Sequence, residues 1–147
     1  MQEVRSRINI AAMYGRSWIE KNLNRSHFGK NFCGACAWAS TYILHRLQQE
    51  EIDAYVAISR IPGGQHAFVV TKNYFVDVTA TQFSKGHDKF LPEVIVASRR
   101  KGREYFWEDI QARLRTPEAV VDFTKEPRWP EEQIPNLRFI EKHYENF

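Results

Sequence analysis

A change in the spacing of apolar residues after residue 50 most constrains how this chain of 147 residues can fold. Before that point, residues 3–23 and 36–50 repeat their apolar side chains at helical spacing. After it come three runs that are rich in strand-forming residues: 54–61, 66–71 and 74–80. Only Lys72 and Asn73 separate the last two runs, and such a short connection predicts an antiparallel hairpin. The sequence therefore predicts two helices followed by an antiparallel sheet.

The remaining segments extend this pattern towards the C-terminus. A further strand is predicted at residues 93–98. Helices are predicted in the last third: over 104–115, from Thr116 onward, and over 131–144 with a break at Pro135. The chain shows no internal repeat and no low-complexity tract. We expect one α+β domain over residues 1–147, with N- and C-terminal helices around a small antiparallel sheet.

Composition excludes several classes of protein. Hydrophobic residues at 43% and charged residues at 27% are ordinary for a globular domain. No stretch approaches the roughly 20 apolar residues that span a bilayer, so no membrane span is predicted. The first seven residues lack the apolar segment of a cleaved signal peptide. We therefore expect a cytoplasmic protein with reduced thiols, and export as an effector without a cleavable signal remains open.

The distribution of charge does not favour a nucleic-acid partner. The formal net charge of +3 is spread along the chain. One dense basic run, residues 99–103, is short enough to be a solvated loop. The sequence carries no signal for a particular oligomeric state.

The two cysteines of the chain lie in one four-residue window, so they cannot form a disulfide framework. They are either buried core residues or chemically active. Cys36 stands where the polar loop 24–35 becomes a helix. The unpaired backbone N–H groups and the positive dipole end of a helix favour the thiolate, which is the nucleophilic form of cysteine. The backbone N–H of Cys36 is also a candidate oxyanion donor, and the Asn31 side chain is a second.

The predicted hairpin provides the other catalytic candidates. With its turn at residues 72–73, Phe68 faces Asp77, and His66 shares their face of the sheet. His66 and Asp77 become diagonal neighbours about 7–8 Å apart, within side-chain reach. A carboxylate beside an imidazole fixes its tautomer, and the second ring nitrogen can then accept a proton from a thiol. The alternative is a core histidine near an aspartate that ends a strand. Pairing is favoured, because burying both groups without partners is costly.

Three motifs resemble the transglutaminase-like core. Gly34-Ala35-Cys36, with Ile52 and Ala54 following, is similar to its Gly-x-Cys helix and the strand after it. His66-Ala67-Phe68-Val69 resembles its His-Ala-Trp-Val strand, and Val76-Asp77-Val78-Thr79 with Gln82-Phe83 resembles its Asp-x-Thr strand. The segment 33–40 also resembles the Cys-Gly-Ser-Cys motif of papain-like proteases, whose second cysteine is the nucleophile. The likeness covers about residues 33–83; Glu51 replaces the usual glycine, and the hairpin turn is shorter than usual.

This resemblance implies a papain/transglutaminase-like fold, in which the helix bearing the nucleophile packs on the sheet. It implies a thiol-dependent hydrolase or acyl transferase that forms a cysteine thioester with protein or peptide amides, without cofactor or metal. A cysteine protease or a protein glutamine deamidase is expected, with a cross-linking transglutaminase as the alternative. The catalytic residues would be Cys36, His66 and Asp77. Gln82 either supports the site or ends the strand; Trp38 is a core residue or, with Gln65, a wall of the substrate pocket.

Three other functions fit parts of the pattern. Cys33 and Cys36 form a Cys-x-x-Cys pair, but a thioredoxin-like pair should follow a buried strand rather than a polar loop. The two cysteines with His66 and Asp77 offer four zinc ligands, but a second tight ligand pair is missing. A binding module without catalytic activity is the third, and the presence of all three triad residues argues against it.

Overall fold

The computed structural model describes residues 2–22, 35–61, 64–82, 91–100, 113–117 and 139–142. They form two helices and six strands, in chain order α1 (Gln2–Asn22), α3 (Cys36–Gln49), β1 (Ala54–Ile61), β2 (Gly64–Thr71), β3 (Tyr74–Asp77), β4 (Ile95–Ser98), β5 (Arg113–Pro117) and β6 (Phe139–Lys142). The α+β class and the N-terminal helix are confirmed. Within the described residues, no helix has both the length and the apolarity that crossing a membrane requires.

The strands form one sheet in the order β4-β3-β2-β1-β5-β6, and all neighbouring pairs are antiparallel. Val69 pairs with Val76, and Val70 pairs with Phe75. This register is the one that a two-residue turn at Lys72-Asn73 requires, so the predicted hairpin is confirmed. Its second strand is shorter than predicted, because β3 ends at Asp77 and a short 3₁₀ turn occupies residues 80–82.

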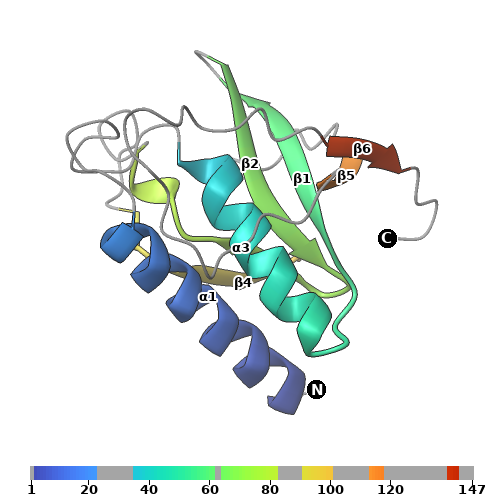
Figure 1. The fold of residues 1–147 in the computed structure, drawn as a ribbon. Helices are drawn as coiled ribbons and strands as arrows, with labels where there is room; N and C mark the ends of the chain where they lie inside the picture. The colour runs from blue at the N-terminus through green and yellow to red at the C-terminus, as the bar shows by residue number, and fades with distance from the viewer. Residues whose placement is uncertain are drawn as a thin grey trace.

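Both helices cover the same face of the sheet (Figure 1). α3 lies across β1 and β2, and α1 lies against α3 and reaches β3 and β4. The helices approach closely at Gly15, where an added Cβ would lie 2.6 Å from Cγ1 of Ile43. The largest apolar cluster fills the space between helices and sheet; it includes Ile8, Ala12, Ile19, Trp38, Ile43, Leu44, Leu47, Val56, Val69 and Val76.

A second apolar cluster contains strand residues of the opposite face: Ala57, Phe68, Val70, Phe75 and Ile95, joined by Ala80 and Leu91. Neighbouring residues on a strand point to opposite faces, so Val69 packs under the helices while Phe68 and Val70 belong to the second cluster. His66 has the same parity as Phe68, and their rings stack with centroids 6.1 Å apart. The histidine is therefore supported by an aromatic layer on the side of the sheet away from α1.

The prediction of C-terminal helices is wrong where the structure describes that region. Residues 113–117 and 139–142 form strands β5 and β6, and β5 pairs with the edge of β1 that β2 leaves open. Helix propensity is a weak local preference, and pairing with an open sheet edge overrides it in a short segment. The fourth strand also begins at Ile95, two residues later than predicted. The rest of these predicted helices, and the loop 24–34, lie outside the described residues.

Candidate functional site

Cys36 is the first residue of α3 and carries a free, half-buried thiol. The helix begins there because Ala39 donates its N–H to the carbonyl of Ala35 at 3.0 Å, the first bond of the helical ladder. The N–H groups of a first helical turn have no acceptor within the helix, and the dipole places its positive end there. The thiol thus lies where negative charge is favoured, as the sequence predicts.

His66 and Asp77 form a buried pair. Nε2 of His66 lies 2.6 Å from Oδ2 of Asp77, and the two side chains are 0% and 1% exposed. The other carboxylate oxygen, Oδ1, accepts the backbone N–H of Thr79 at 2.9 Å and the Thr79 hydroxyl at 3.4 Å. Both oxygens of Asp77 therefore have partners, and the side-chain contact predicted from the hairpin register is confirmed.

The Cys36 thiol lies close enough to the His66 ring to interact with it by charge and by hydrogen bonding. Because Nε2 is used by Asp77, Nδ1 is the ring nitrogen left for the sulfur. Burial by itself lowers the pKa of His66. The charge and hydrogen bond of Asp77, helped by the hydrogen bond and charge of Cys36, outweigh that effect and raise the pKa from 6.5 to about 10. The imidazole is therefore held in its protonated form at neutral pH.

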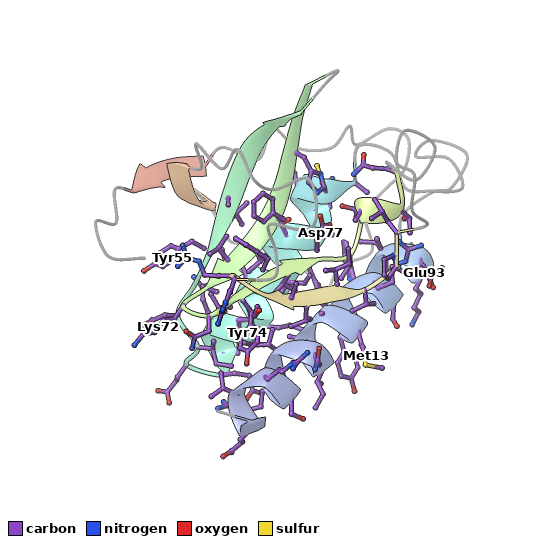
Figure 2. All side chains as sticks on the ribbon, turned by 180° about the vertical axis from the view of Figure 1, so that it is seen from behind. Met13, Tyr55, Lys72, Tyr74, Asp77 and Glu93 are labelled. Carbon is purple, nitrogen blue, oxygen red and sulfur yellow. The ribbon has the colours of Figure 1, made fainter. Side chains whose placement is uncertain are left out.

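β3 ends before the position that lies opposite this histidine. In the β2–β3 register, the residue opposite His66 is Thr79, which lies beyond the last residue of β3. β2 continues past this point to Gly64 while paired with β1 on its other side. Figure 2 shows Asp77 beside α3, at the end of the sheet where the helix begins.

Gln82 also reaches the site, from the short turn after β3. Its backbone N–H donates to the carbonyl of Thr79 at 3.2 Å, which closes the turn. Its Nε2 lies 3.5 Å from Nδ1 of His66, the ring nitrogen that Asp77 does not use. At this distance the amide adjoins the Cys36–His66 pair without holding the ring tightly.

Of the remaining predicted residues, Trp38 lies apart from this group, and the other side chains fall outside the described part of the structure. Trp38 is 4% exposed and packs against Trp18 with ring centroids 6.1 Å apart, so its ring belongs to the core beneath the helices. Gln65 lies on β2 opposite Arg60, and its side chain is outside the described residues. Asn31 and Cys33 also fall outside them. Of the side chains that are described, no three His, Cys, Asp or Glu residues are grouped to hold a metal ion.

Sequence reasoning missed Arg16, a buried arginine of α1. The residue is 6% exposed, and its guanidinium reaches the segment between Asp77 and Gln82. A sequence signal was present. Arg16 follows Ile8 and Ala12 at helical spacing and precedes Ile19 on the same apolar stripe. A charged residue inside such a stripe needs a buried partner.

The arrangement can support nucleophilic chemistry at a carbonyl. It combines a thiol at a helix start, a base in contact with it, and a carboxylate that orients the base. Cys, His and Asp come from one helix and two neighbouring strands, in that order along the chain. No protein-family model, no curated protein and no solved structure matches this chain.

Proposed function

We propose that this protein is a thiol-dependent hydrolase or acyl transferase that acts on amides of proteins or peptides through a thioester on Cys36. The observation that carries the proposal is the continuous contact from the Cys36 thiol to His66 and from His66 to the buried Asp77 carboxylate. A buried histidine that contacted only an aspartate could serve the stability of the fold and have no catalytic role. The contact with a thiol at a helix start adds what a nucleophile needs.

The same three residues support a papain- or transglutaminase-like core as the finer description of the fold. In this interpretation α3 is the nucleophile helix, β2 is the histidine strand and β3 is the aspartate strand, as the sequence motifs imply. The hairpin turn is shorter than is usual in that core, and the resemblance does not extend to the residues beyond β4. The support comes from residue order and geometry only.

The reaction begins with the thiolate of Cys36 and the imidazolium of His66. The sulfur attacks the amide carbonyl carbon, a C–S bond forms, and the carbonyl electron pair moves to oxygen. Backbone N–H groups at the start of α3, that of Cys36 first, stabilise this oxyanion. His66 then donates its proton to the departing nitrogen, the C–N bond breaks, and a thioester remains.

The second half of the reaction releases the acyl group. His66, now neutral, removes a proton from water, the resulting oxygen nucleophile attacks the thioester carbon, and the C–S bond breaks. Asp77 holds the ring with Nδ1 towards the sulfur in both halves. Water as acceptor produces cleavage at a peptide bond or deamidation at a glutamine side chain, whereas an amine as acceptor produces cross-linking.

The first experiment measures how fast Cys36 is alkylated by iodoacetamide, in a Cys33→Ser background so that only one thiol reacts. We expect Cys36 to react much faster at mildly acidic pH than the same thiol in the His66→Gln variant, because the imidazolium stabilises the thiolate. His45 is the matched control, since it lies on α3 but has no place in the triad; His45→Gln should leave the rate unchanged. Equal rates for the protein with His66 and the His66→Gln variant would refute the proposal.

The second experiment identifies the acyl acceptor. Casein is incubated with the wild-type protein or with Cys36→Ala, with and without cadaverine, and its intact mass is measured. Fragments indicate a protease, a small mass gain from replacing amide nitrogen by oxygen indicates a deamidase, and addition of cadaverine indicates a transferase. Any of these products should disappear with Cys36→Ala; a product that survives in that variant contradicts the assignment of Cys36.

A further inference from the structure

Arg16 connects helix α1 to the segment that follows Asp77. It lies on α1, far in sequence from the hairpin, and its side chain is 7% exposed. Nη1 donates to the carbonyl of Val78 at 2.9 Å and to the Thr81 hydroxyl at 3.3 Å. Nε donates to Glu20 at 2.8 Å, and Nη2 lies 3.7 Å from Glu93. The guanidinium thus joins α1 to the turn after β3 and to the segment before β4.

The bond to Val78 acts on the carboxylate of Asp77 through a single peptide group. The carbonyl of Val78 and the N–H of Thr79 are opposite ends of the same planar unit. Arg16 holds the carbonyl end at 2.9 Å, and Oδ1 of Asp77 accepts the N–H end at 2.9 Å. A charged donor on the carbonyl also polarises the peptide and strengthens its N–H as a donor.

We propose that Arg16 is a positioning residue of the catalytic site: by fixing the 78–79 peptide plane, it orients the Asp77 carboxylate towards His66. This inference rests on the proposed function for its catalytic meaning, although the orientation itself can be measured separately. Oδ1 is held by the peptide plane, so Oδ2 is directed at Nε2 of His66 at 2.6 Å.

The second contact of Arg16 extends the same role to Gln82. Thr81 carries the hydroxyl that accepts from Nη1, and Gln82 is its neighbour at the end of the turn. The turn closes through the Gln82 N–H and the Thr79 carbonyl at 3.2 Å. One buried guanidinium thus anchors both ends of the segment that presents Asp77 and Gln82 to His66. Figure 2 shows Glu93 beside the C-terminal half of α1, where Arg16 reaches it.

The test compares Arg16→Met with Arg7→Met. Arg7 is on the same helix and also joins it to α3, through Glu50 at 2.7 Å, but Glu50 lies just past the end of α3 opposite to Cys36. Both variants lose a guanidinium and an inter-element contact. We expect Arg16→Met to slow iodoacetamide alkylation of Cys36 at neutral pH by roughly tenfold or more, because small misplacement of catalytic groups has large effects on rate. Arg7→Met should stay within about twofold of wild type.

A second readout is the titration of His66, followed by NMR of the ¹⁵N-labelled imidazole. Asp77 and Cys36 raise the pKa of His66 against its burial, so a misdirected Asp77 lowers it from about 10 in Arg16→Met. If Arg16 acted merely as a positive charge near the site, removing it would raise the pKa instead, although Glu20 and Glu93 offset part of that charge. The two mechanisms therefore predict shifts of opposite sign.

Arg16→Lys keeps the test decisive if the methionine variant does not fold. Lysine retains the charge and one donor to Val78 but cannot form the fork that also holds Thr81. We expect a His66 pKa and an alkylation rate between those of wild type and a site without Arg16. A folded Arg16 variant with wild-type values of both would overturn the inference. Failure of the proposed function looks different, since Cys36 would then react equally with and without His66 in the wild-type background.

Discussion

Burial and charge act in opposite directions on His66. The side chain is fully buried, and burial alone lowers the pKa of a histidine because the charged form loses hydration. The adjacent Asp77 carboxylate, at 2.6 Å, reverses this and raises the pKa to about 10. The ring thus keeps its proton through neutral pH, and it can stabilise a thiolate without first acquiring a proton from solvent.

Replacing Asp77 by asparagine tests whether the Asp77 charge is what raises the pKa of His66. The shape is kept, but the charge that supports the imidazolium is removed while the burial remains, so the pKa of His66 should fall. We expect the alkylation rate of Cys36 at neutral pH to fall by roughly 10²-fold or more, as when an orienting carboxylate is lost from a triad. NMR titration of the imidazole and alkylation kinetics provide the two measurements.

Asp53→Asn is the matched control for that variant. Asp53 is exposed and precedes β1, so its loss removes one carboxylate without touching the site. The His66 titration and the Cys36 rate should match wild type there. If Asp77→Asn and Asp53→Asn behaved alike, the Asp77 contact would have no electrostatic role.

The two helices are positioned against each other by a residue without a side chain. At Gly15 a Cβ would lie 2.6 Å from Cγ1 and 3.0 Å from Cδ1 of Ile43, which is itself 1% exposed. Cγ1 is close to the backbone of α3 and cannot swing away as a flexible chain end would. Arg16 follows this contact directly, so the approach of the helices also places the guanidinium beside the turn after β3.

Gly15→Ala should therefore destabilise the protein, although alanine favours helix formation over glycine. Propensity alone would stabilise α1 by up to about 1 kcal/mol. Overpacking of a tight contact typically costs about 1–3 kcal/mol, so we expect a net loss in the free energy of unfolding, measured in urea. Ser17→Ala, at an exposed position of the same helix, should be neutral or slightly stabilising. A stabilising Gly15→Ala would contradict the close helix contact.

At the scale of the whole molecule, the His66 pair couples folding to pH. The pKa of His66 is raised from 6.5 to about 10 by Asp77 against burial, so the folded state binds a proton more tightly than the unfolded chain. Its contribution to stability is complete below pH 6.5, where both states are protonated. It is lost as the pH rises from 6.5 to about 10, because the folded state must then release a proton that the unfolded chain has already lost.

Urea unfolding at several pH values across this window measures the coupling. We expect the free energy of unfolding of wild type to decrease between pH 6.5 and about 10 more steeply than that of His66→Gln, which lacks the proton. The titrating groups that do not contact His66 are common to both proteins, so they cancel in the comparison. Parallel curves would show that the His66 proton is not bound more tightly by the folded state.

The local pattern of the sequence was sufficient to predict the helices and strands around the site. Helical spacing predicted α1 and α3, and the two-residue connection at Lys72-Asn73 set the register of β2 and β3. That register alone brings His66 and Asp77 to neighbouring positions on one face, because side chains alternate along strands. The pairing of these two residues was therefore predictable from spacing within a single hairpin.

Tertiary structure decided the features that depend on segments far apart in the chain. An open edge of the sheet offers backbone partners to residues 113–117 and, through them, to residues 139–142, so both segments form strands. Local residue preferences do not contain this information. Cys36 meets His66 because α3 packs on β2, and Arg16 reaches Val78 because Gly15 lets α1 approach α3. The sequence determined which chemical groups share a hairpin or a helix. Only packing decided which of these elements meet, since contacts between distant segments depend on the closed fold rather than on local spacing.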